Sequence, residues 1–567
     1  MKTKRVIPVI FSAVILVIAA FSTFAQIKRA DFNRPQTVDI QHYVIRASFD
    51  RAKKTVSGDT TVSFRPISSD LRSIELDAVD LKFTSVKLEP SGIDLNYKAA
   101  NGKITITLDK AYGADETIAV RLKYSAEPKK GVYFVDASSS ADGVKHSAQI
   151  WSQGEAEEAR HWFPSYDFPS DKATTEQYIT AQSKETVIGN GEFLGKADNG
   201  DGTSTWHYKM PVPHSTYLVS FVIGEYVKIE DKYKDIPLGF YVYPGKEVTA
   251  RKAFGDTKKM IAVYEELTGV AFPYNKYDQT IVSQFQFGGM ENITATTMAD
   301  TEIFFAEFDF GKMTVMDLVS HELAHSWFGD LVTCRNWAEL WLNEGFATFM
   351  EAAYRENQFG RGDYMRKIRS DAAAFLVDDS INRRRHALYN QRAADVDSLF
   401  DNAATTYNKG GAIVHTLREQ VGNENFWKAI NIYLNRHKFG PVESTDLRKA
   451  MEEVSGQELT WFFDQWVYGA GAPSLSVKQT FSQRSKSLTL TVSQIQLTDT
   501  ITPAVFRLPL TISYKVGGKK VVQQIDVSKR IQSFTFKTDG KPSDLEIDPD
   551  ERIPLKKLKF KPLVVTK

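Results

Sequence analysis

Apolar and polar residues alternate along the first part of the chain. Runs such as HYVIRASFD at 42–50 and ITITLDK at 104–110 place every second side chain on an apolar face, and turn residues separate them. This period is typical of strands that are buried on one side. Because the pattern continues to about residue 227, we predict an N-terminal antiparallel β-domain over 26–227.

The period changes from about residue 253, where apolar residues recur at helical spacing. Segments 312–331 and 337–357 are the longest of these stretches. They predict a mixed α/β domain with most of the helices over 228–468. Alternation returns after 469 and predicts a small C-terminal β-sandwich over 469–567. The expected fold is therefore multidomain α+β.

Composition fits a chain of two to four folded domains. The 567 residues are 42% hydrophobic and 12% aromatic, enough for sizeable cores. The net charge is +1, so no overall field would recruit nucleic acid, and we expect no nucleic-acid partner. Cys334 is the single cysteine, which excludes an intrachain disulfide.

The first 25 residues have the pattern of a secretory signal. A basic start, MKTKR, precedes an apolar stretch and the small-residue site TFA at 23–25. We expect cleavage after Ala25, export to the periplasm or the medium, and no stable membrane span afterwards. An uncleaved membrane anchor is the alternative, although the apolar run is short for a spanning helix.

The stretch SHELAHSWFGD at 320–330 suggests a metal site. His321 and His325 share one face of a helix, and Glu322 projects beside them. The alternative is that the two histidines are packed on a helix and bind no metal. The metzincin pattern needs a Gly three residues after the second His and a third His six residues after it. It is excluded, because these positions hold Phe328 and Leu331.

A carboxylate from the next helix can complete the site. Glu344 follows His325 after eighteen intervening residues, enough to turn and return antiparallel. Two histidines and one glutamate form a catalytic zinc set with one position left for water. We therefore predict one Zn²⁺ per chain, held by His321, His325 and Glu344.

The motifs resemble those of the gluzincin zinc aminopeptidases, the family of aminopeptidase N and leukotriene hydrolase. Residues 321–349 carry HExxH and the WLNEG-like segment, and FGGMEN at 287–292 is similar to the exopeptidase motif of the family. The segment 152–174, SQGEAEEARHWFPSYDFPSDKAT, resembles a third family landmark. The resemblance covers about residues 35 to 475.

The resemblance implies a thermolysin-like catalytic domain and roles for individual residues. Glu322 would act as the general base on a metal-activated water, and Tyr407 of YNKG would donate to the oxyanion. Carboxylates that read a free α-ammonium are expected among the substrate-binding residues, with Glu291 and Glu155 the first candidates. The expected substrate-binding residues are Gln153, Glu155, Gly288, Gly289, Met290, Glu291 and Asn292.

The predicted function is a secreted zinc aminopeptidase that acts on peptides with a free N-terminus. A thermolysin-type endopeptidase is the nearest alternative, and the GGMEN and SQGE segments argue against it. A non-catalytic peptide-binding protein would be expected to lose Glu322 or Tyr407, and both are present. Lipid epoxide hydrolysis is a remote alternative. No helical C-terminal domain follows the β-sandwich in this sequence, so we expect an open cleft that accepts longer peptides.

Overall fold

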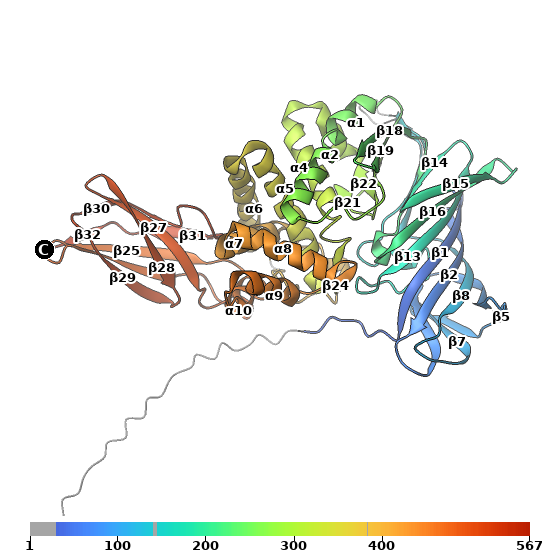
Figure 1. Ribbon diagram of the computed structural model, residues 1–567, viewed down its shortest axis with the longest axis horizontal. Coiled ribbons are helices and arrows are strands. Elements are labelled where there is room, and N and C mark those ends of the chain that lie inside the picture. Colours follow the sequence, from blue (N-terminus) through green and yellow to red (C-terminus); the bar gives the residue numbers. More distant parts are fainter. Residues whose placement is uncertain (1–29, 140–144, 383) are drawn as a thin grey trace, which may run out of the picture. The chain divides into compact units, whose positions relative to one another are not determined.

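The computed structural model describes residues 30–139, 145–382 and 384–567 (Figure 1). The predicted signal sequence at 1–25 lies outside the described residues. Strands before residue 225 pair only with one another, and so do those after residue 473. Between them lies the part of the chain that contains the α-helices. The fold is multidomain α+β.

The N-terminal part is built from three main sheets. The largest has the order β15-β16-β13-β1-β2-β8-β4-β5, the second β14-β17-β12-β9 and the third β3-β7-β6. The strands are β1 (Val38–Asp50), β2 (Thr55–Pro66), β3 (Leu71–Asp77), β4 (Lys82–Glu89), β5 (Ile93–Asp94), β6 (Tyr97–Ala100), β7 (Lys103–Tyr112), β8 (Ile118–Ala126), β9 (Val132–Val135), β12 (Gln149–Ser152), β13 (Ala173–Gln182), β14 (Thr186–Gly189), β15 (Glu192–Asp198), β16 (Thr203–His214) and β17 (Phe221–Gly224), with a two-stranded pair β10 (Ser138–Ser139) and β11 (Lys145–His146).

One pair in the largest sheet departs from the antiparallel expectation. β1 and β13 run parallel, with His42 opposite Thr174. Parallel neighbours need a long connection, and more than a hundred residues separate these two strands along the chain. The other ladders of the three main N-terminal sheets are antiparallel.

The central part joins a mixed sheet to a set of helices. The sheet has the order β18-β19-β20-β22-β21, with β21 at one edge. Its strands are β18 (Val227–Tyr233), β19 (Ile236–Val242), β20 (Tyr277–Val282), β21 (Gly289–Met290) and β22 (Ala295–Ala299). The helices are α1 (Glu247–Phe254), α2 (Thr257–Thr268), α3 (Asp300–Ile303), α4 (Lys312–Ala324), α5 (Trp341–Phe359), α6 (Arg361–Ile381), α7 (Gly410–Val421), α8 (Asn423–His437), α9 (Ser444–Ser455) and α10 (Thr460–Trp466), with a strand pair β23 (Val332–Cys334) and β24 (Gly440–Val442).

The C-terminal part is a pair of sheets. One has the order β29-β26-β25-β31, with β32 also on β25, and the other β28-β27-β30. The strands are β25 (Ser474–Ser482), β26 (Ser487–Gln494), β27 (Leu508–Val516), β28 (Lys519–Val527), β29 (Ile531–Lys537), β30 (Pro542–Ile547), β31 (Lys557–Phe560) and β32 (Val564–Thr566). Buried Leu490 of β26 and Leu510 of β27 belong to one hydrophobic cluster that continues into the central part.

Two glycines let α5 and α7 approach each other closely. A Cβ on Gly410 would lie 2.6 Å from the Gly345 Cα, and a Cβ on Gly345 would lie 2.8 Å from the Gly410 Cα. Both distances are shorter than any normal carbon–carbon contact. Gly345 follows Glu344 directly, and Gly410 ends the YNKG segment. The backbone contact therefore fixes the distance between these two predicted site segments.

We predict that Gly410→Ala destabilises the protein. The added methyl group overpacks the α5–α7 contact, which costs about 1–3 kcal/mol and outweighs the gain of about 0.5–1 kcal/mol from removing a helical glycine. Chemical denaturation measures the change as a lower midpoint. The control is Gly362→Ala on α6, where a Cβ meets nothing within 4 Å and the midpoint should stay or rise. A Gly410→Ala midpoint equal to that of the wild type would contradict the packing argument.

Candidate metal centre and active site

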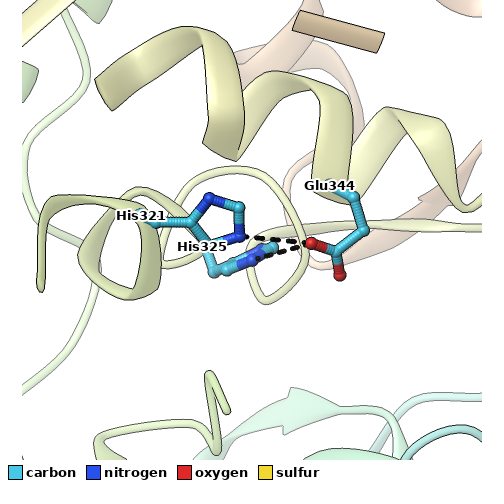
Figure 2. Close-up of side chains that lie close together, drawn as sticks. All are labelled: His321, His325 and Glu344. Atoms are coloured by element: carbon cyan, nitrogen blue, oxygen red, sulfur yellow. Dashed lines mark hydrogen bonds and ion pairs between the residues drawn. The ribbon is translucent and has the colours of Figure 1, made fainter. Parts of the chain in front are cut away.

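The two histidines of HExxH lie at the C-terminal end of α4, and Glu344 lies in the first turn of α5. The Glu344 Oε2 atom is 3.2 Å from His321 Nε2 and 3.4 Å from His325 Nε2. Figure 2 shows both imidazole rings turned toward this one carboxylate. The structure thus brings together the three residues that the spacing predicts as zinc ligands.

The other ring nitrogen of each histidine has its own partner. His321 Nδ1 lies 2.8 Å from Glu351 Oε1, and His325 Nδ1 donates to the Phe328 carbonyl at 2.8 Å. These contacts orient the rings so that both Nε2 atoms point to Glu344. Metal-ligating histidines usually have such partners, which fix the tautomer.

The three residues fit a zinc ion. One ligand atom from each lies within 4.8 Å of the others, and all three side chains are buried. Two neutral imidazoles and one carboxylate are the donor set of catalytic zinc, and they leave a position for water. Zn²⁺ would therefore be held by His321, His325 and Glu344.

The metal-ligand residues shift one another's pKa before a metal ion is considered. Burial opposes the charge on Glu344, yet the two histidines outweigh it and lower its pKa to about 2. Burial also opposes protonation of His321, but Glu344 and Glu351 outweigh it and raise its pKa to about 9. The raised pKa of His321 shows that this position favours a positive charge, which a divalent cation also supplies. The lowered pKa of Glu344 keeps its carboxylate ionised, as a metal ligand must be.

Glu322, the predicted general base, packs against a glycine. Burial raises the pKa of Glu322 to about 8, and the two histidines offset this only in part. A Cβ built on Gly289 would lie 2.3 Å from Glu322 Oε1. Gly289 therefore provides the space that the Glu322 carboxylate occupies. A divalent cation at the histidines would stabilise the carboxylate form of Glu322, as a base requires.

Tyr407 faces the metal site from a π-helical turn, Thr405–Lys409. Its ring stacks on the His321 ring with centroids 6.0 Å apart and planes at 17°. Burial raises the pKa of Tyr407 well above its usual value, and Glu344 raises it further. The hydroxyl is therefore protonated at neutral pH and available as a hydrogen-bond donor, the state that an oxyanion donor needs.

Two buried carboxylates converge beside the metal ligands. Glu155, Glu291 and Glu344 each place an oxygen within 4.8 Å of the others. Glu155 Oε1 is buried without a hydrogen-bond partner, and burial followed by Glu291 raises its pKa well above the usual value. Like charges this close are unfavourable unless a cation joins them. An alkylammonium group fits this need through charge-assisted hydrogen bonds.

These residues line one cavity of about 810 Å³. It contains the predicted ligands and base, with Tyr407, Glu155, Gly288, Gly289 and Glu291. Gln153, Met290 and Asn292, also predicted to bind substrate, are buried but are not among the lining residues. Gln153 Nε2 instead contacts Met290 Sδ at 3.2 Å. The aromatic rings of Phe287 and Phe400, 5.7 Å apart, add an apolar wall.

Sequence reasoning missed Glu351 as a partner of His321. The available signal was its spacing: Glu351 follows Glu344 by seven residues, two turns along the same face of α5. Sequence reasoning also missed Lys367 of α6, which lies 2.9 Å from Glu351 and lines the cavity. Nothing in the spacing along the chain indicates that contact.

Comparison with known proteins agrees with the fold and with the arrangement of these residues. Residues 252–466 match the peptidase family M1 domain, and residues 40–218 match the peptidase M1 N-terminal domain. The chain therefore belongs to peptidase family M1.

Relatives in this family carry aminopeptidase names. The chain is 29% identical to probable aminopeptidase 2 of Sulfurisphaera tokodaii over 90% of its length and 63% of that protein. It is 32% identical to aminopeptidase N of Streptomyces lividans over 58% of its length and 39% of that protein. Glutamyl aminopeptidase of Bos taurus is 27% identical, over 79% of this chain and 48% of the relative. The chain thus spans between 39% and 63% of the length of these relatives.

We predict that Gly289→Ala lowers kcat strongly while zinc stays bound. The new methyl group must displace the Glu322 carboxylate. Because neither Gly289 nor Glu322 is a predicted metal ligand, zinc should stay bound. Elemental analysis of the purified variant measures the zinc, and steady-state kinetics measures the loss, which we expect to be about 10²-fold or more.

Gly288→Ala is the graded comparison for this variant. Its Cβ would meet only the flexible end of Leu318, at 3.1 Å, so a smaller loss is expected. If both variants kept wild-type kcat, Gly289 would not determine where Glu322 lies.

Proposed function

We propose that this protein is a zinc-dependent aminopeptidase that removes N-terminal residues from peptides. The observation that supports this most directly is the pair Glu155 and Glu291, buried together beside the His-His-Glu set. A hydrolytic metal site alone would cleave any amide presented to it. Two carboxylates that need a cationic partner at this position restrict the site to substrates with a free α-ammonium. The aminopeptidase names of the relatives agree.

The residues of the chain divide the chemistry between them. Zinc, when bound, supplies a Lewis acid that polarises the scissile carbonyl and acidifies water. Glu322 takes a proton from the attacking water and delivers it to the leaving amine. Tyr407 donates its hydroxyl hydrogen to the oxyanion of the tetrahedral intermediate.

Substrate orientation follows from the edge of the mixed sheet. β21 pairs with β22 on one side only, through Gly289 and Met298. Its other side is the edge of the sheet, and Gly288 and Gly289 line the cavity. An extended peptide can add to this edge as a further strand. The ammonium group would then lie at Glu291, immediately after β21, and at Glu155.

The alternatives fit these observations less well. A thermolysin-type endopeptidase needs no amine-reading carboxylates, and a buried carboxylate pair without a cation is unfavourable. A non-catalytic peptide-binding protein has no need for a glycine at 289 that leaves space for the Glu322 carboxylate, or for the stack of Tyr407 on His321.

We also propose export, on the signal pattern of residues 1–25 alone. Among the described residues, none of the helices has both the length and the apolar character that crossing a bilayer requires.

The proposal predicts that a peptide of about ten residues shortens from its N-terminus in single-residue steps. Mass spectrometry of a time course follows the products. Glu322→Gln should lower kcat by about 10²- to 10⁴-fold, because the proton shuttle is lost, while zinc content is retained. The matched control is Glu266→Gln on the exposed face of α2, which should act as the wild type. Internal cleavage products at early times would instead support the endopeptidase alternative.

A further inference from the structure

A closed ring of side-chain contacts links the metal-ligand His321 to Tyr407. His321 Nδ1 contacts Glu351 Oε1 at 2.8 Å, and Glu351 Oε2 lies 2.9 Å from Lys367 Nζ. Lys367 Nζ donates to both oxygens of Asp371, at 2.8 and 2.9 Å.

Asn408 completes the ring. Its Nδ2 donates to Asp371 Oδ1 at 2.9 Å. Asn408 follows Tyr407 directly in the π-helical turn, and the Tyr407 ring stacks on the His321 ring. The contacts therefore start and end at the pair His321 and Tyr407, and they pass through α5 and α6.

The ring is buried or partly buried, and each charged member has a partner of opposite charge. The side chains of Glu351 and Lys367 are each 11% exposed, and that of Asp371 is 5% exposed. Lys367 lies between two carboxylates, so neither carboxylate is left uncompensated. Charge-assisted hydrogen bonds of this kind are short and strong, and they fix geometry within a low-dielectric interior. None of the four residues outside the pair His321 and Tyr407 is a predicted metal ligand or proton carrier.

We propose that Lys367, Asp371 and Asn408 are positioning residues that fix Tyr407 and His321 relative to each other. Asp371, reaching from α6, holds Asn408 and thereby the turn that places the Tyr407 hydroxyl. Lys367 holds Glu351 and thereby the His321 ring. This inference rests on the proposed function, because Tyr407 matters only when an oxyanion forms.

The π-helical turn gives a physical reason for such support. A π-helical turn is rare and is frequently found at functional sites. The hydrogen bond from Asn408 to Asp371 connects this turn to the neighbouring helix α6. Positioning matters because a displacement of about 1 Å from the productive geometry costs up to about 10²-fold in rate.

The test is a double-mutant cycle between Asn408 and Tyr407. Asn408→Ala should lower kcat about tenfold, with KM changed less than about twofold, because the donor is misplaced only for the transition state. In a Tyr407→Phe background, which has no hydroxyl to place, Asn408→Ala should change kcat less than about twofold. Asn408→Asp, of the same shape, should lose at least as much as Asn408→Ala, because it sets a carboxylate against Asp371.

The second arm tests the other half of the ring. Lys367→Met should weaken zinc affinity about tenfold in a chelator competition, because Glu351 no longer holds His321 firmly. The control is Asn435→Ala on α8, an exposed asparagine whose Nδ2 donates to the Asn431 carbonyl. It should match the wild type in kcat and zinc affinity, and thermal melts establish that every variant is folded.

The outcomes separate this inference from the proposed function. An inactive, zinc-loaded wild type would overturn the proposed function and this inference with it. An active wild type with an equal loss from Asn408→Ala in both backgrounds would overturn the link to Tyr407 alone. A wild-type kcat for Asn408→Asp would overturn the role of the Asp371–Asn408 contact. A zinc affinity of Lys367→Met within about twofold of the wild type would overturn the role of Lys367 in holding Glu351 and His321.

Discussion

Buried negative charge beside two histidines is the constraint on which the site depends. Glu155, Glu291, Glu322 and Glu344 converge in one cavity, where burial penalises each charge. The raised pKa values of Glu155 and Glu322 show that protons or other cations must offset this charge. The proposed function supplies two cations: a metal ion held by the histidines and Glu344, and a substrate ammonium group beside Glu155 and Glu291. Charge balance thus couples metal binding and substrate recognition in one small volume.

The fold holds this charge by close backbone contacts. α5 carries Glu344 and crosses α7 at Gly345 and Gly410, so the metal ligand and the Tyr407 turn have a fixed separation. β21 approaches α4 so closely that only a glycine fits beside Glu322. Four segments, α4, α5, α7 and β21, are therefore positioned by contacts that leave no space for an added carbon atom. These contacts keep Glu322, Glu344 and the Tyr407 turn close together.

Much of this could be predicted from the sequence, because its signals are local. Alternation and helical period give the fold class, and HExxH with Glu344 gives the metal set, since a helix places residues i and i+4 on one face. The ring through Lys367, Asp371 and Asn408 could not be predicted, because its contacts join α5, α6 and a π-turn without any regular spacing. The parallel pairing of β1 with β13 could not be predicted either, because no regular spacing along the chain connects the two strands. Gly288 and Gly289 are predicted only as substrate-binding residues, and the sequence gives no sign that Gly289 also makes room for Glu322.

The most direct test compares one peptide with a free N-terminus and its N-acetylated twin, each with and without a zinc chelator. The account predicts that only the free peptide is hydrolysed, that the chelator abolishes this activity, and that added Zn²⁺ restores it. Equal hydrolysis of both peptides would contradict the central claim, because Glu155 and Glu291 would then not recognise the α-ammonium group.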